Sequence, residues 1–276
     1  MKRRVDHVKF GACVILVAVA AFAGYGYAQQ VPLPKTAAEV PGPASGNKMT
    51  KEYVQMVGRM AYLWGYPMVN SHNRRVAFST APKPVLVGGV LPFAPVGYNA
   101  MLTNYIAPNQ TFIACPNQDV VYGAGFSALD KEPTVFQVPD FGDRFWVYAL
   151  YDQRTDEIAQ IGQQYGTKPG FYLIVGPNWK GEAPQGINAV LRSSTDLVFS
   201  IPRIFKDDTA EDTKAVQPLI NQVVFHPLST FDGTMKTVDW SKVPHVPVSL
   251  RFAFHCPTVL SVSPIGFRRA AFRLFV

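Results

Sequence analysis

The sequence is short of the residues that most often mark a catalytic or metal centre. Three cysteines and five histidines are spread over 276 residues, and they form no CxxC, HExxH or paired-histidine spacing. A structural zinc site is therefore not expected, and we predict no cofactor and no metal. No GxSxG segment surrounds a serine, so the chain also lacks the nucleophile elbow of many hydrolases.

Acidic residues are missing from one end of the chain. Residues 241–276 contain no Asp or Glu and carry a net charge of +5, residues 1–28 carry +3, and the body between them carries −1. The total of +7 therefore comes from the two ends, and the body has no basic stripe. Nucleic-acid binding loses its main electrostatic support.

A single long apolar run is present, and it lies at the N-terminus. Basic residues from Lys2 to Lys9 precede the run, and Gly26-Tyr27-Ala28 closes it with small residues. This pattern predicts a signal peptide over 1–28 that is cleaved before Gln29, and a periplasmic or secreted protein. The alternative is a membrane anchor formed by residues 10–28, which carry no charge. Residues 29–49, rich in Pro, Gly and Ala, are expected to be a flexible linker.

Export would remove Cys13 and leave Cys115 and Cys256. One pair could form a disulfide in an oxidising compartment. Because Cys256 lies in the atypical C-terminal segment, we expect Cys115 to be a buried free thiol.

Two helices are predicted from apolar spacing and capping residues. Thr50 can cap a helix over 51–64, which Gly65 and Pro67 should break or kink. Its aromatic residues are expected to pack against a sheet, with a ligand-stacking face as the alternative. Residues 69–110 look irregular. A second helix should begin at Thr209, with a kink or break at Pro218, and end at His226-Pro227.

Short strands separated by turn residues dominate the rest of the chain. The segment 144–151 is nearly continuously apolar and aromatic, which indicates a central strand, with Trp146 and Tyr148 on one face. Pro202 should mark the end or an edge position of its strand. The predicted class is α+β, mainly β. The expected strands are Thr111–Cys115, Val120–Ser127, Thr134–Val138, Arg144–Tyr151, Glu157–Ile161, Gly170–Val175 and Thr195–Ile204.

An ordered set of short motifs resembles one bacterial family. The motifs are Trp64-Gly-Tyr-Pro, Asn117-x-Asp119-x-x-Tyr122, Pro139 with Arg144-Phe145, Asp152-x-x-Thr155, and Gly170-x-Tyr172-Leu-Ile-x-Gly-Pro177-x-Trp179-x-Gly181. Over about residues 51–230 the chain resembles the family called domain of unknown function 1254. The resemblance implies an immunoglobulin-like antiparallel β-sandwich with a small helical part, and it implies no particular activity. Val120 departs from the family pattern, which commonly has Thr there.

The polar residues of these motifs are candidates for a ligand site. We single out Asn117, Asp119, Tyr122, Arg144, Asp152 and Thr155, which could converge at one rim of the sandwich. A carboxylate, a guanidinium and a phenol together can bind a polar ligand or support acid–base chemistry. The competing interpretation is structural, with Asn117 to Asp119 as an Asx turn and Arg144 paired with Asp119 or Asp152.

Two functions follow from these features. The first is an exported, non-enzymatic binding or assembly module whose partner is a small molecule or an envelope protein, with a homo-oligomer as a further possibility. The second is a periplasmic hydrolase-type enzyme that uses Asp119 with His72 or His226. A histidine nitrogen within hydrogen-bond reach of Asp119 or Asp152 would favour the enzyme.

Residues 241–276 are atypical of a native domain. They lack acids, contain four prolines and show no sustained period of 2 or 3.6. The resemblance implies a second β domain, domain of unknown function 1214, after residue 240, and none is recognisable. We therefore interpret 241–276 as frameshifted or truncated. The alternative is a basic tail that contacts an anionic membrane, as the N-terminal segment also could.

Overall fold

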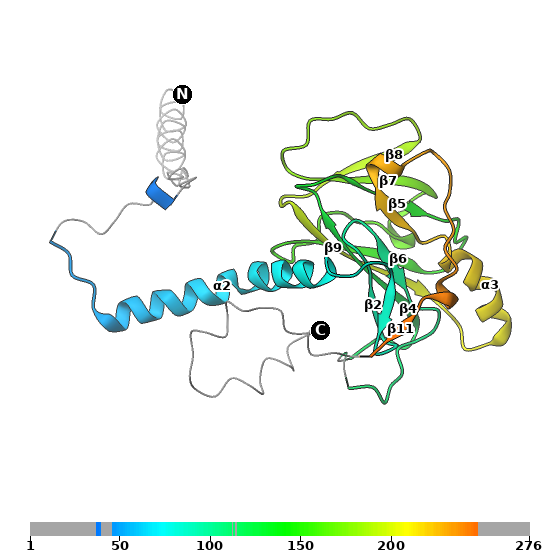
Figure 1. The fold of residues 1–276 in the computed structure, drawn as a ribbon, viewed down its shortest axis with the longest axis horizontal. Helices are drawn as coiled ribbons and strands as arrows, with labels where there is room; N and C mark the ends of the chain where they lie inside the picture. The colour runs from blue at the N-terminus through cyan, green and yellow to red at the C-terminus, as the bar shows by residue number, and fades with distance from the viewer. Residues whose placement is uncertain (1–36, 40–45, 112, 114, 248–276) are drawn as a thin grey trace, which may run out of the picture. The chain divides into compact units, whose positions relative to one another are not determined.

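A computed structural model describes residues 37–39, 46–111, 113, 115–247 of the chain (Figure 1). The chain divides into two compact units, residues 1–56 and 57–276. The described part of the first unit holds a short 3-10 helix, η1 (Ala37–Glu39), and the start of helix α2 (Lys51–Phe78). Thr50 caps that helix, because its hydroxyl accepts the Tyr53 N–H at 3.2 Å, as the sequence predicts.

The second unit is a mainly β sandwich of the α+β class, which confirms the predicted fold class. One four-stranded sheet has the order β3-β4-β9-β6, another has the order β10-β5-β7-β8, and a three-stranded sheet has the order β11-β1-β2. The strands are β1 (Val85–Val87), β2 (Leu91–Phe93), β3 (Asn99–Met101), β4 (Val120–Ala128), β5 (Thr134–Val138), β6 (Trp146–Asp152), β7 (Gly170–Val175), β8 (Ile187–Arg192), β9 (Leu197–Phe205), β10 (Phe225–Pro227) and β11 (His245–Val246).

Aromatic side chains fill the space between the two four-stranded sheets. The Tyr148 ring of β6 lies 5.6 Å from the Phe136 ring of β5 and 5.7 Å from the Phe225 ring of β10. Its hydroxyl donates to the Gln137 carbonyl at 3.1 Å, so the buried phenol is satisfied. Trp146 is buried beside Tyr148 while Phe145 is 43% exposed, which confirms the predicted alternation along this strand.

The strand expected to be central, β6, lies instead at the edge of its sheet. Strand β9 occupies the centre and pairs with both β4 and β6 in antiparallel register. Residues 156–162 cover the free edge of β6 through backbone hydrogen bonds such as Tyr148 N–H to Ile161 C=O at 2.9 Å. The expected strand over 157–161 is thus reduced to isolated bridges. Because this segment covers the free edge of β6, that strand can be as apolar as a central one.

Pro202 also departs from expectation, because it lies inside the central strand rather than at its end. The recorded β4–β9 pairs stop at Tyr122–Arg203 and resume at Gly125–Ser200, on either side of the proline. A proline has no N–H to donate, so the sheet tolerates it where the ladder is interrupted.

Helix α2 is longer than predicted and runs through Gly65 and Pro67 to Phe78. Its end is fixed by packing, since the Phe78 ring lies 4.0 Å from the Phe93 ring and 4.8 Å from the Phe126 ring. Arg75 adds an ion pair to Asp130 at 3.2 Å. These contacts explain why the helix continues despite one missing backbone hydrogen bond. The region expected to be irregular, 69–110, therefore contains the end of α2 and strands β1 to β3.

Helix α3 (Ala210–Ile220) begins as predicted, with the Thr209 hydroxyl accepting the Asp212 N–H at 3.1 Å. Val216 and Ile220 bury the inner face of α3 in the core between the sheets. The helix ends before His226, which lies in strand β10 instead of at a helix end.

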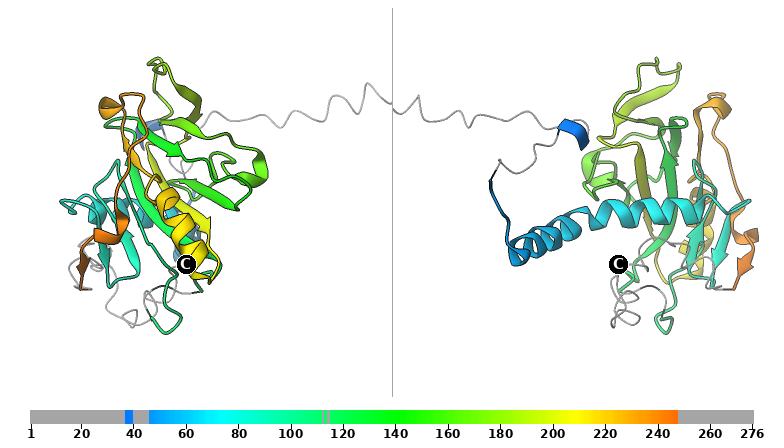
Figure 2. Two further views of the ribbon diagram at one scale, coloured as in Figure 1. Left: turned by 90° about the vertical axis from the view of Figure 1, so that its right-hand side faces the viewer. Right: turned by 60° about the vertical axis from the view of Figure 1, so that its left-hand side comes forward.

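Beyond β10 the chain passes from the sheet of β5 to that of β1, shown in orange in Figures 1 and 2. Trp240 is buried on the way, and His245 and Val246 pair in parallel with β1. The predicted signal peptide over 1–28, most of the linker, and residues 248–276 lie outside the described residues, as do Cys13 and Cys256.

Candidate functional site

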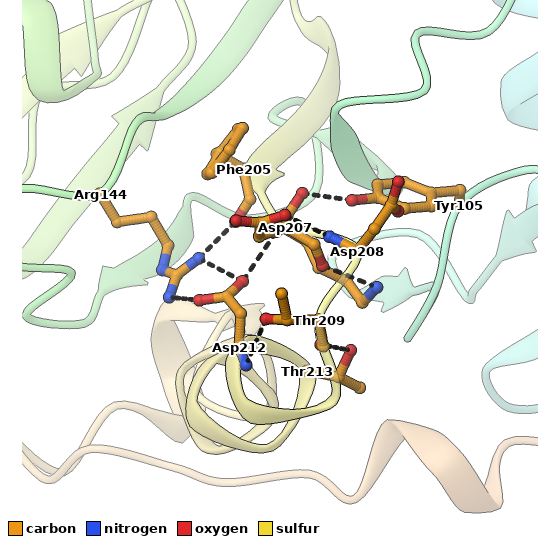
Figure 3. Close-up of polar contacts among 9 residues, drawn as sticks. Tyr105, Arg144, Phe205, Asp207, Asp208, Thr209, Asp212 and Thr213 are labelled. Atoms are coloured by element: carbon orange, nitrogen blue, oxygen red, sulfur yellow. Dashed lines mark hydrogen bonds and ion pairs between the residues drawn. The ribbon is translucent and has the colours of Figure 1, made fainter.

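Four of the six predicted site residues gather where β9 leads into α3. The starts of β4 and β6 flank the end of β9, because Val120 pairs with Phe205 and Trp146 pairs with Ile204. This register brings Asn117, Asp119, Tyr122 and Arg144 next to residues 203–213, which we call the β9–α3 corner. Figure 3 shows Arg144 with Phe205, Asp207 and Asp212 at this corner. The predicted convergence at one rim therefore holds for these four residues.

Arg144 organises the corner by binding Asp212. Its guanidinium donates two hydrogen bonds to the Asp212 carboxylate, one of them 2.9 Å long, and a third to the Phe205 carbonyl at 3.0 Å. The prediction that Arg144 pairs with Asp119 or Asp152 is wrong, because the β9–α3 connection places the Asp212 carboxylate against the Arg144 guanidinium. Hydrogen bonds from Arg144, and then from the Asp207 N–H, lower the pKa of Asp212.

Asn117 forms the predicted Asx turn. Its side-chain oxygen accepts the Asp119 N–H at 2.7 Å, and its own N–H donates to the Tyr122 hydroxyl at 2.9 Å. The Tyr122 ring lies under the Arg203 guanidinium at 5.6 Å. Within the described residues the exposed carboxylate of Asp119 makes no hydrogen bond or ion pair, so Asp119 is the one free charge of the predicted set at this corner.

Asp152 and Thr155 lie apart from the corner, at the opposite end of β6. The Asp152 carboxylate is buried and accepts the N–H groups of Arg154 and Asp156 at 2.7 and 3.1 Å, together with the Ser194 hydroxyl. Thr155 adopts φ 72°, a conformation that the turn imposes on it. These two residues hold a turn and do not join the other four.

Sequence reasoning missed Tyr105 and Lys206 at the corner. Lys206 is 5% exposed, its ammonium donates to the Asp207 carbonyl at 3.2 Å, and it lies 4.5 Å from the centre of the Tyr105 ring. The Tyr105 hydroxyl donates to the Lys206 carbonyl. Burial, followed by the charge of Asp208, raises the pKa of Tyr105. The only sequence signal is the run Lys206-Asp-Asp-Thr209 before a helix, which is too common to be informative.

Neither candidate histidine reaches the carboxylates. His226 is buried in the other sheet, where Nδ1 lies 3.0 Å from the Thr230 hydroxyl oxygen and 3.1 Å from the Pro227 carbonyl. The Thr230 hydroxyl also donates to that carbonyl, and burial lowers the pKa of His226. His72 is exposed on α2, and among the described residues no hydrogen bond joins either histidine to Asp119 or Asp152.

An open groove follows α3 away from the corner. Its lining is mostly amide and hydroxyl side chains, several of which already hydrogen-bond within the protein, such as Gln217 to Asn221 at 2.9 Å. In the part of the chain that the structure describes, no three His, Cys, Asp or Glu side chains gather as a metal site would require. The lining residues are Asp208, Ala210, Thr213, Lys214, Gln217, Pro218, Asn221, Gln222 and Thr237.

Exchanging Arg144 for glutamine is expected to lower the free energy of unfolding by about 1–3 kcal/mol, since it leaves a partly buried Asp212 carboxylate without its hydrogen bonds. Because the pKa of Asp212 is depressed in the folded protein, the pair stabilises fully above the ordinary value of 3.8 and is lost as the pH falls below it. Urea denaturation at pH 7 and pH 3 measures both effects. As the control, Asp119→Asn should change stability by less than about 0.5 kcal/mol; a larger loss than for Arg144→Gln would contradict the assignment.

Parts of this chain are similar to known proteins. A family model described as "Protein of unknown function (DUF1254)" matches residues 98–227. The crystal structure of the VPA0106 protein from Vibrio parahaemolyticus is similar at 24% sequence identity and a TM-score of 0.46. The match covers 64% of this chain and 40% of that one, so this chain spans less than half the length of that protein. No curated protein matches the sequence.

Proposed function

We propose that this protein is an exported, non-enzymatic binding or assembly module; residues 98–227 match the model of a family of unknown function, DUF1254. One observation carries the proposal. Helix α2 exposes large apolar side chains, with Met60, Leu63 and Trp64 at 63%, 70% and 74%. Contiguous exposed apolar surface of this kind marks interaction sites on soluble proteins.

The aromatic residues of this helix were expected to pack against the sheet, yet among the described residues nothing covers Trp64. Tyr62 is also 58% exposed, and the contacts of α2 with the sheets lie in its second half, from Met68 to Phe78. Trp, Tyr, Met and Arg are the residues enriched at protein interfaces, whereas Lys, Glu and Asp are depleted there. Residues 57–69 contain Tyr, Trp, Met and Arg and no Lys, Glu or Asp, which supports a protein partner.

The hydrolase alternative has less support. It needs a hydrogen bond between Asp119 and His72 or His226. The Nδ1 atom of His226 contacts Thr230 and Pro227 instead. Arg144 and Asp152 are both engaged in holding local structure, which leaves them unavailable to a substrate. Within the described residues Asp119 is the one unpaired charge of the set, and a lone exposed carboxylate without a histidine partner supports a scaffold more than a catalyst.

Export is the second part of the proposal and rests on the N-terminal sequence. Among the described residues no helix has the length and apolar character needed to cross a bilayer. The segment 1–28 combines a basic start, an apolar run and a small-residue cleavage site. We propose the periplasm or the outside of the cell as the location, with anchoring by residues 10–28 as the alternative.

A photoreactive amino acid at position 64 tests both parts in living bacteria. After irradiation, the chain should be recovered outside the cytoplasm, begin at Gln29 and show a cross-linked species of higher mass. The matched control is the same amino acid at Val190, a 41% exposed residue of β8, which should give no such species. A cytoplasmic chain that retains residues 1–28, or equal behaviour at the two positions, contradicts the proposal.

A further inference from the structure

Strand β9 carries one charged residue, Arg203, among eight uncharged ones. The next residue, Ile204, faces inward, because it pairs with Trp146 in the core between the two four-stranded sheets. Arg203 therefore lies on the outer face of its sheet, beside its two cross-strand partners, Tyr122 of β4 and Val147 of β6. A guanidinium is thus placed on the central strand of this sheet and not at its rim.

The guanidinium of Arg203 has no acceptor among the described residues. Its Nε is buried without a hydrogen bond, and in the described part of the chain no hydrogen bond or ion pair engages its two terminal nitrogens, which are not enclosed. A buried polar group without a partner in a native structure calls for an explanation. Burial of Nε also removes part of the hydration of the charge, so an anion is attracted to it more strongly than in open water.

The ring beneath this guanidinium is held in place. The centre of the Tyr122 ring lies 5.6 Å from Arg203 Cζ, and the Tyr122 hydroxyl accepts the Asn117 N–H at 2.9 Å. Asn117 is itself fixed by its hydrogen bond from the Asp119 N–H at 2.7 Å. The Asx turn therefore positions the ring and the guanidinium before any ligand arrives, which lowers the cost of ordering them on binding.

The two neighbouring cations at the β9–α3 corner are already engaged. Arg144 binds the Asp212 carboxylate, and the Lys206 ammonium donates to the Asp207 carbonyl at 3.2 Å. A phosphate group, which carries up to two charges, would find one cation for both. A single carboxylate, by contrast, matches the fork of one guanidinium with two parallel hydrogen bonds.

The surroundings of Arg203 on this face are apolar and partly uncovered. At the other end of the face, Phe199 stacks on Phe126, and Phe78 of α2 packs against Phe126. Near Arg203, the neighbouring residues Phe145 and Phe205 are 43% and 37% exposed. Aromatic side chains around an arginine are typical of the residues that contribute most of the binding energy in protein interfaces.

We propose that Arg203 binds the carboxylate of an Asp or Glu side chain of a partner protein, and that apolar neighbours of that acid pack on Phe145 and Phe205. The acid comes from another molecule, because residues 241–276 hold no acidic side chain and no ion pair joins Asp119 to Arg203 among the described residues. The inference rests on the proposed function and names the chemistry of a partner. It uses a surface other than the exposed side chains of α2.

Titration with a short peptide tests the site. The chain recovered from cells is labelled with ¹⁵N, and nuclear magnetic resonance follows the Arg203 Nε–Hε signal while acetyl-Phe-Glu-Phe-amide is added. The peptide should move this signal and bind at least about tenfold more tightly than acetyl-Phe-Gln-Phe-amide, since a charge-assisted hydrogen bond is lost with glutamine. Equal binding of the two peptides, or an unchanged Arg203 signal, overturns the inference.

Substitutions test the role of the guanidinium. Arg203→Gln should remove the preference for the acidic peptide, and Arg203→Lys should reduce it, because lysine keeps the charge without the planar fork. The matched control, Arg59→Gln, removes the same charge from an exposed position of α2 and should keep the full preference. If Arg203→Gln does not fold, Phe145→Ala leaves the charge in place and should weaken binding of both peptides; unchanged binding contradicts the site.

The possible failures are distinguishable. If Asp119→Asn moves the Arg203 signal without peptide, the chain's own carboxylate occupies the site and the inference is wrong. If 3-phenylpropionate binds as tightly as the acidic peptide, the site takes a small carboxylic acid and the protein partner is wrong. Loss of the acid preference with an intact cross-link at position 64 overturns this inference alone. An acid preference without that cross-link supports Arg203 and overturns the role proposed for α2.

Discussion

Replacing Trp146 with alanine is expected to lower the free energy of unfolding by about 3–5 kcal/mol, the usual cost of removing a large buried aromatic side chain. Trp146 is 3% exposed, and its ring lies 5.2 Å from both the Phe141 and Tyr148 rings. The cavity would open at the edge strand of one sheet, directly beside the Tyr148 phenol that bridges to the other. Chemical denaturation followed by far-ultraviolet circular dichroism measures the loss.

The adjacent residue provides the control. Phe145 is 43% exposed, so Phe145→Ala should cost less than about 1 kcal/mol although it removes an aromatic ring of similar size. Similar losses for both variants would mean that the alternation of buried and exposed positions along this strand is misassigned.

Replacing Asp152 with alanine is expected to lower the free energy of unfolding by about 2–4 kcal/mol, because it leaves several buried hydrogen-bond donors without an acceptor. The carboxylate accepts the Arg154 and Asp156 N–H groups and the Ser194 hydroxyl, and the Arg154 guanidinium lies 3.9 Å away. Thermal and urea unfolding should both show the loss. Asn in place of Asp keeps one acceptor oxygen and should recover part of the stability.

Asp156, four residues on, is the matched control for Asp152. Its side chain is exposed and only its backbone takes part in the turn, so Asp156→Ala should change stability by less than about 0.5 kcal/mol. An Asp152→Ala variant of unchanged stability that loses binding of any ligand would move Asp152 from a structural role to a functional one.

Local signals in the sequence predicted local structure well. Thr50 and Thr209 cap helices where hydroxyl residues precede an apolar period, and Asn117 forms the turn that its side chain favours. The alternation around Trp146 is visible for the same reason, since it depends on a period of two within one strand.

Features that depend on distant partners were not predictable. Arg144 pairs with Asp212, 68 residues away, only because β9 delivers the start of α3 to the end of β6. Strand β8 was missed because its burial follows no clean alternation, and it pairs in parallel with β7 where antiparallel pairing was expected. Cys115 was expected to be a buried thiol, but it is exposed with φ 49°.

The six candidate residues illustrate both cases. The proximity of Asn117, Asp119 and Tyr122 follows from their position at the start of β4, whereas Arg144 joins them through β9. Asp152 and Thr155 begin the turn after the same strand that Arg144 precedes, so the seven-residue length of β6 separates the two groups. A motif can be ordered in sequence and still be divided between two ends of a sheet.

The central position of β9 also determines the order in which the molecule can be assembled. Its partners β4 and β6 are made first, but they pair with β9 and not with each other. Their main sheet therefore stays incomplete until the chain has been synthesised through Phe205. Such non-local pairing slows folding, because closing a long loop costs conformational entropy before any contact forms to offset that cost. A nascent chain of this protein would therefore pair β3 with β4 and β5 with β7 before β9 can join β4 to β6.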